Sequence, residues 1–148
     1  MMDFHVHTCF CDGKNSPEEM VLAAIKLKME KIGLVYHSYV PFDEESCIKK
    51  GNETAFCDEI DRLREKYRGK IELFKGVEKD YFSDTSDSGC DYVIGSVHYI
   101  KIGGEYFSVD ESAEKFKALA QNTFGGDYYA LAEEYFRLVS EGRDHRTF

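Results

Sequence analysis

The chain opens with Asp3-Phe4-His5-Val6-His7-Thr8, and Cys11-Asp12-Gly13 follows shortly after. Two histidines at positions i and i+2 of an extended segment point to the same face of a strand. Their imidazoles can therefore converge on one point, which is the geometry that a bound metal ion requires. The stretch predicts a first strand with two metal ligands, and Asp12 as a further ligand on the next turn. The simpler alternative is a pair of surface or core histidines on an N-terminal strand.

Segments typical of strands and helices alternate along the rest of the chain. We expect strands near 2–7, 32–36, 71–75 and 92–97, and helices from 17 and over 53–68, 110–121 and 127–141. Parallel strands joined by crossover helices produce this alternation, so the sequence predicts an α/β fold.

The first helix has a clear start signal. Ser16 is expected to be the N-cap, with Pro17 at the first helical position and Glu19 closing a capping box. Its buried stripe is predicted to consist of Met20, Ala24 and Leu27.

Chemically versatile side chains lie where the predicted strands end. His37 follows the second strand, Glu78 the third and His98 the fourth, so that four of the five histidines lie at this edge and only His145 does not. In barrels and open α/β sheets, this edge is where active sites are built. The pattern therefore predicts a metal cluster with the ligands His5, His7, Asp12, His37, Glu78 and His98.

The residue types in this set indicate which metals it suits. Mixed imidazole and carboxylate ligands favour zinc, manganese or iron over calcium, which prefers oxygen ligands. Glu78 follows Gly76 and Val77 and is the candidate carboxylate for bridging two ions. Asp80 is a candidate for supporting a metal ligand without binding the ion itself.

Several of these residues also have an alternative interpretation. Asp12 could serve only the turn beside Gly13, and Glu78 could be one exposed acid in an acidic protein. Cys9 and Cys11 could form a structural zinc site with the first two histidines, but no second cysteine pair with suitable spacing follows.

The bulk properties narrow the class of protein. A chain of 148 residues is expected to form one domain, residues 1–148. The net charge of −9 argues against nucleic acid as the main partner. We find no apolar run long enough to span a membrane and no signal-peptide pattern. The five cysteines are an odd number without a disulfide-scaffold spacing, so reduced thiols and a cytoplasmic location are expected.

The motifs together resemble the polymerase and histidinol phosphatase (PHP) superfamily, and within it the histidinol-phosphatase branch. The resemblance extends to about residue 142. It is carried by Asp3-Phe4-His5-Val6-His7-Thr8, Asp12-Gly13, His37-Ser38, Gly76-Val77-Glu78, Gly95-Ser96-Val97-His98, Ser108-Val109-Asp110-Glu111-Ser112 and Phe124-Gly125-Gly126-Asp127-Tyr128-Tyr129.

This resemblance implies a fold, an activity and a cofactor. The fold would be a partial, distorted (β/α)7 barrel, roughly its first four βα units, with two or three divalent ions at the carboxyl edge. The activity would be hydrolysis of L-histidinol phosphate to L-histidinol and phosphate, in histidine biosynthesis. The six candidate ligands match the family's motifs, and Glu78 would be the bridging ligand.

The chain departs from the family pattern in two places. Cys11 stands where a serine is common in this branch. A later Gly-His motif and a C-terminal Asp-x-His motif have no match, and no ligand is assigned to His145. The resemblance therefore implies an incomplete barrel, whose open edge a second copy of the chain could cover.

Several functions remain open at this point. The main hypothesis is phosphomonoester hydrolysis of a small molecule, which at a metal site needs no nucleophilic serine or cysteine. Another PHP phosphoesterase or an amidohydrolase-like metal hydrolase is a second reading, although no bridging lysine motif is evident. The third is a truncated, metal-binding remnant without activity.

Overall fold

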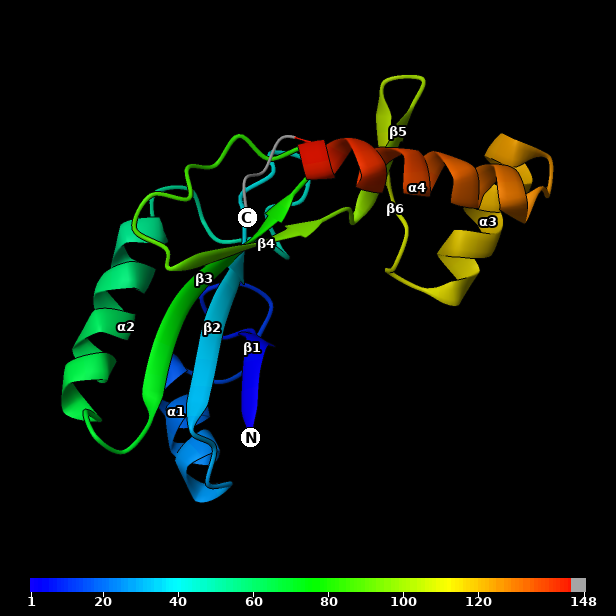
Figure 1. Cartoon of the computed structure of the whole chain (residues 1–148). Coiled ribbons are helices and arrows are strands. Elements are labelled where there is room, and N and C mark those ends of the chain that lie inside the picture. The colour runs from blue at the N-terminus through cyan, green and yellow to red at the C-terminus, as the bar shows by residue number, and fades with distance from the viewer. Residues whose placement is uncertain (145–148) are drawn as a thin grey trace. The chain divides into compact units, whose positions relative to one another are not determined.

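The computed structural model describes residues 1–144, which form two compact units. The first comprises Met1–Lys79 and Ser83–Ile94, and the second comprises Asp80–Phe82 and the chain from Gly95 onward. The elements in chain order are β1 (Met2–Val6), α1 (Pro17–Lys26), β2 (Lys31–His37), α2 (Glu53–Lys66), β3 (Glu72–Asp80), β4 (Tyr92–Ser96), β5 (Tyr99–Ile102), β6 (Glu105–Ser108), α3 (Ala113–Phe124) and α4 (Tyr128–Asp144). Figure 1 labels these elements.

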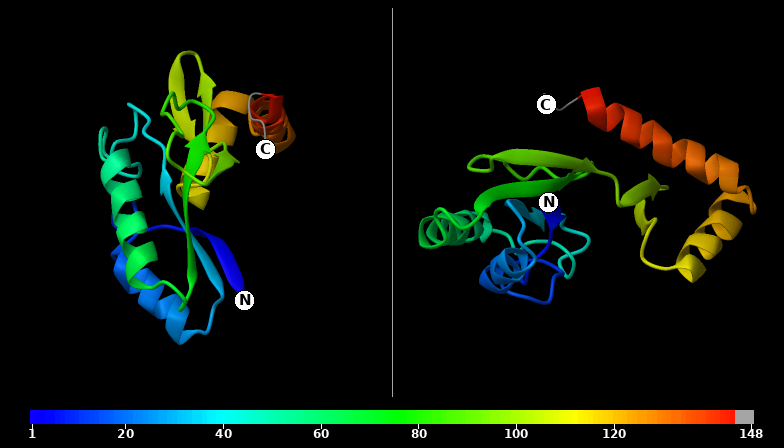
Figure 2. Two further views of the ribbon diagram at one scale, coloured as in Figure 1. Left: turned by 60° about the vertical axis from the view of Figure 1, so that its left-hand side comes forward. Right: turned by 60° about the horizontal axis from the view of Figure 1, so that its bottom comes forward.

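The first unit is built on a sheet whose strands follow chain order. Its order is β1-β2-β3-β4, and the pairs β1–β2 and β2–β3 are parallel. Helices α1 and α2 lie together on one face of β1–β3, as Figures 1 and 2 show. The predicted α/β alternation is therefore confirmed for this part of the chain.

The first helix begins as the sequence predicts. The Ser16 side chain accepts a hydrogen bond from the backbone of Glu19, and the Glu19 side chain accepts one from the backbone of Ser16. The prediction for its buried stripe is wrong at Leu27, which caps the end of α1 and is 62% exposed. Val21 takes that place and is fully buried next to Ala24.

The two faces of the central strands have different roles. In β2 and β3, Lys31, Gly33, Val35 and His37 pair with Glu72, Phe74, Gly76 and Glu78, respectively. Paired residues share a face, so His37 and Glu78 are direct neighbours on one side of the sheet. The opposite face carries Ile32, Leu34 and Tyr36 with Leu73 and Val77, and these residues join α1 and α2 in one core.

Tyr92 covers part of the face that carries His37 and Glu78. A Cβ atom at Gly76 would lie 2.4 Å from the Tyr92 ring, and one at Gly33 would lie 2.2 Å from the Tyr92 hydroxyl. The hydroxyl donates a hydrogen bond of 2.7 Å to the Phe4 carbonyl oxygen. Glycine at these two positions thus lets the tyrosine lie against the strands and tie β4 to β1.

The second unit contains a hairpin that the sequence analysis did not predict. Strands β5 and β6 pair antiparallel, and Gly103 and Gly104 connect them with φ values of 62° and 92°. Two consecutive positive φ angles are typical of a type I′ turn, for which glycine is well suited. The hairpin packs with α3 and α4 around the buried residues Ile100, Leu119, Leu131 and Leu138.

Helix boundaries in the second unit differ slightly from expectation. α3 begins at Ala113 because Ser112 caps it by accepting a hydrogen bond from the Lys115 backbone. α4 begins at Tyr128, one residue later than predicted.

Within residues 1–144, no helix has the length and apolar character needed to cross a membrane.

Candidate metal centre

Three elements of the first unit bring the candidate ligands together. His5 lies within β1 and His7 follows its end, while His37 is the last residue of β2. Glu78 lies inside β3, because this strand continues to Asp80 rather than ending near residue 75 as predicted. Because His37 pairs with Glu78, the pairing of β2 with β3 extends past the end that was expected for β3, and both side chains lie on one face.

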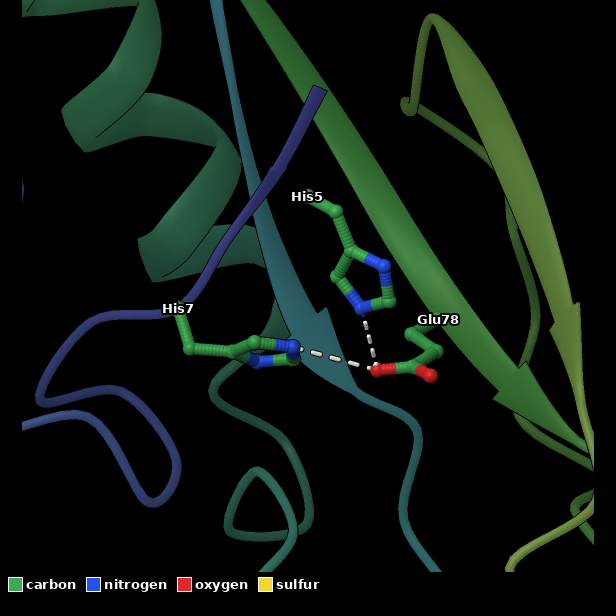
Figure 3. Close-up of side chains that lie close together, drawn as sticks. All are labelled: His5, His7 and Glu78. Carbon is green, nitrogen blue, oxygen red and sulfur yellow. Dashed lines mark hydrogen bonds and ion pairs between the residues drawn. The ribbon is translucent and has the colours of Figure 1, made fainter. Parts of the chain in front are cut away.

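The three imidazoles converge on a single oxygen of Glu78. Its Oε2 atom lies 2.9 Å from His5 Nε2, 3.1 Å from His7 Nε2 and 3.2 Å from His37 Nδ1. Figure 3 shows the contacts of His5 and His7 with this carboxylate. The rings of His7 and His37 are stacked, with centroids 4.1 Å apart. Glu78 itself is only 5% exposed.

A tight loop after β1 places Asp12 on the other side of the stacked rings. The Oδ1 atom of Asp12 lies 3.7 Å from His7 Nδ1, and its Oδ2 atom lies 3.6 Å from His37 Nε2. The loop closes on the Thr8 carbonyl oxygen, which accepts hydrogen bonds from the backbones of Cys11 and Gly13. A Cβ atom at Gly13 would lie 2.6 Å from the Thr8 backbone, so only glycine fits there.

These donors fit a divalent metal ion. The ligand atoms of His5, His7 and Glu78 lie within 4.8 Å of one another, and so do those of His7, Asp12 and His37. Metal–ligand bonds of about 2.0–2.2 Å place two ligand atoms of one ion at most about 4.4 Å apart. Small side-chain shifts would therefore bring each group into position to bind one ion. The set combines imidazole nitrogens with carboxylate oxygens, as zinc, manganese and iron sites do.

The environment of His7 changes its protonation. Burial alone would lower the pKa of His7, but hydrogen bonds with Cys11 and Glu78 outweigh this effect and raise the pKa from 6.5 to about 9. The metal-free site therefore favours a positively charged His7 beside the buried Glu78 carboxylate.

The remaining two candidates lie in the second unit. Asp80 is 3% exposed and accepts hydrogen bonds from the backbones of Phe82 and His98, at 2.8 Å and 2.9 Å. The Nδ1 atom of His98 lies 3.3 Å from the same Asp80 oxygen that binds its backbone. The pair has the carboxylate–histidine arrangement that orients metal-binding imidazoles.

The sequence suggested Cys11 only as a ligand of an alternative structural zinc site with Cys9, and not as a partner of a metal-binding histidine. Its sulfur lies 3.3 Å from Nδ1 of His7. The available signals were its position four residues after His7 and its departure from the serine common in the resembling branch. His145, to which no ligand role was assigned, lies outside the described residues.

The chain is similar to proteins of one known family. A family model described as the PHP domain matches residues 3–140. A curated histidinol-phosphatase from Bacillus subtilis (strain 168) is 28% identical and aligns with 93% of this chain and 58% of its own length. A protein named "Probable histidinol-phosphatase" from Deinococcus radiodurans is 26% identical and aligns with 90% of this chain and 55% of its own length.

A solved structure resembles the fold. A Listeria monocytogenes protein assigned as a histidinol phosphatase superposes with a TM-score of 0.68 at 23% identity, over 79% of this chain and 52% of that one. This likeness, together with the parallel sheet in chain order, confirms the predicted α/β class and the partial barrel. The chain spans little more than half the length of the relatives that it matches.

Proposed function

Because this chain belongs to the PHP domain family, we propose that it is a metal-dependent phosphomonoesterase acting on L-histidinol phosphate. The products are L-histidinol and phosphate, and the pathway is cytoplasmic histidine biosynthesis. The relatives named histidinol-phosphatase support this substrate. The observation that carries the proposal is the convergence of three imidazole nitrogens on one oxygen of the buried Glu78.

The site would hold two or three divalent ions, namely zinc, manganese or iron. Bound ions of this kind neutralise phosphate oxygens and lower the pKa of a water molecule. Glu78 is the bridging ligand in this proposal, because its single oxygen is reached from three sides. The full ligand set is His5, His7, Asp12, His37, Glu78 and His98, and Asp80 orients His98 from outside it.

The exposure of the ligands indicates where substrate enters. The side chains of His5 and Asp12 are about half exposed, at 47% and 49%, whereas those of His7 and His37 are 20% and 19% exposed. Substrate therefore approaches over His5 and Asp12, and Glu78 remains beneath it. The net charge of −9 does not attract a phosphate ester, so the ions must supply the positive charge.

Release of inorganic phosphate from L-histidinol phosphate tests the proposal. Protein verified as folded is loaded with manganese or zinc and compared with the variants Glu78→Gln and Glu72→Gln. Loss of the bridging carboxylate should lower the rate by more than about 100-fold, beyond the 10–100-fold cost of removing a residue that only orients a metal ligand. Glu72 lies on the same strand and is 62% exposed, so its variant should keep the activity.

Other results point to the alternatives. Hydrolysis of cyclic amides but not of phosphate esters would indicate an amidohydrolase-like enzyme. Binding of metal by the loaded chain without turnover of either substrate class would refute the proposed activity and leave a metal-binding protein.

A further inference from the structure

His7 contacts the centre through one ring nitrogen and a thiol through the other. Its Nε2 atom lies 3.1 Å from Glu78 Oε2, and its Nδ1 atom lies 3.3 Å from the sulfur of Cys11. Asp12 is farther from Nδ1, at 3.7 Å, which exceeds a normal hydrogen bond. Cys11 is thus the nearer partner on the side of the ring that faces away from Glu78.

The hydrogen-bond directions around the sulfur define the role of each atom. The Cys11 thiol donates to the Thr8 carbonyl oxygen, with sulfur and oxygen 3.7 Å apart. With its proton directed at Thr8, the sulfur offers lone pairs to His7 and acts there as an acceptor. His7 Nδ1 then carries the proton, which makes Nε2 the nitrogen that can bind a metal ion.

The loop holds the sulfur in this position. The Cys11 backbone donates a hydrogen bond of 3.0 Å to the same Thr8 carbonyl oxygen, and Thr8 is fully buried. The backbone and the side chain of Cys11 therefore both bind the Thr8 carbonyl oxygen, which holds the sulfur in place.

We propose that Cys11 is a positioning residue of the metal centre, whose sulfur accepts the Nδ1 proton of His7 and so fixes His7 as an Nε2 ligand. This rests on the part of the proposed function in which His7 binds an ion. It does not depend on the identity of the substrate. A serine hydroxyl at the same position can accept the same hydrogen bond, whereas a methyl group cannot.

Binding of Zn²⁺ and Mn²⁺ to the full chain, measured by chelator competition, tests this role. Removal of a residue that hydrogen-bonds to a metal-binding histidine typically costs 10–100-fold in metal affinity. We expect Cys11→Ala to weaken binding by about 10-fold or more and Cys11→Ser to restore affinity to near that of the unaltered chain. Cys9→Ala is the matched control, because Cys9 is an exposed thiol in the same loop and its variant should bind normally.

A second readout separates positioning from general structural support. Nitrogen NMR of the zinc-loaded protein should show His7 ligated through Nε2 with a proton on Nδ1, in both the unaltered chain and Cys11→Ser. In Cys11→Ala this signal should become heterogeneous, while the metal-free variant still unfolds in one cooperative thermal transition.

Specific outcomes would overturn the proposal. These are equal metal affinity of Cys11→Ala and the unaltered chain, ligation of His7 through Nδ1, or no metal binding by the unaltered chain. A thiolate-to-metal charge-transfer band in the cobalt-substituted protein would instead make the sulfur a direct ligand and refute the positioning role. Loss of affinity in Cys11→Ala without phosphate release by any variant supports the role of Cys11 and refutes only the phosphatase function.

Discussion

At the scale of single residues, the buried Glu78 carboxylate has the strongest requirement for nearby positive charge in the site. A carboxylate that is 5% exposed is costly when ionised unless positive charge lies close to it. In the metal-free chain, a protonated His7 supplies that charge, as its raised pKa indicates. Bound cations would replace this proton, so protons and metal ions compete for the same few atoms.

This competition makes metal binding sensitive to pH. His7 must lose its proton to act as a ligand, so metal affinity should fall about tenfold per pH unit below its raised pKa of about 9. Calorimetry in buffers of different ionisation enthalpy should show about one proton released per binding event near pH 7.5. The control His7→Gln should release no such proton, and affinity that is constant between pH 6.5 and 9 would contradict the expectation.

Stability of the metal-free chain should follow the opposite trend. The pKa of His7 is raised on folding, so its contacts with Cys11 and Glu78 stabilise the fold fully below pH 6.5. Their contribution is lost as pH rises through about 9.

At the scale of elements, the packing of Tyr92 against β2 and β3 links the strands beneath the site. Gly76 lies two residues before Glu78 on the same face of β3, and the Tyr92 ring occupies the space that its side chain would need. The ring also packs near Phe4, with centroids 5.7 Å apart. Strand geometry and ligand position are therefore coupled through one aromatic side chain.

The variant Gly76→Ala tests this coupling. The added methyl group would overlap the ring and should destabilise the chain by about 1–3 kcal/mol, the usual cost of overpacking. In a Tyr92→Ala background the same substitution should cost little, because the clashing ring is absent. Denaturant unfolding of the two single variants and the double variant measures the difference, and equal costs in both backgrounds would show that the ring is not the cause.

Elements differed in how well the sequence predicted them. An apolar run defined β2, a capping box defined the start of α1 and the spacing of apolar residues defined α2, because these signals are local. The hairpin β5–β6 was missed although Gly103-Gly104 marks its turn, because each strand has only four residues. The length of β3 was underestimated, because its second half is held by pairing with β2 rather than by an apolar run.

At the scale of the whole molecule, five of the six predicted ligands lie in the first unit. Their convergence follows from parallel strand order, which places strand ends at a common edge, and this part of the site was predictable. Which ligand atoms face one another was not predictable from the sequence, because this depends on strand register and side-chain rotamers. The metal-binding roles of all six candidate ligands and the supporting role of Asp80 stay predictions. So do the single-domain assignment and the covering of an open edge by a second copy.

Metal removal should lower the stability of the whole chain. An ion present at 100 times its dissociation constant stabilises the folded state by about 2.7 kcal/mol. For a chain of this size that corresponds to a rise in Tm of about 5–10 °C over the chelated protein. Thermal unfolding with added zinc or manganese measures it, and calcium should have less effect because it prefers oxygen ligands. The double variant His5→Ala/His7→Ala should lose the rise, and an unchanged rise in that variant would place the stabilising ion elsewhere.

The pairing of β2 with β3 also determines which kinds of mutation the site can survive. Side chains alternate between the two faces of a strand, so a change of one residue in strand length reverses every position beyond it. Deleting one residue between Glu72 and Glu78 would turn the carboxylate toward the helices, into the apolar core around Leu73 and Val77. These strands can therefore diverge by substitution but not by insertion or deletion, and length variation is confined to the loops.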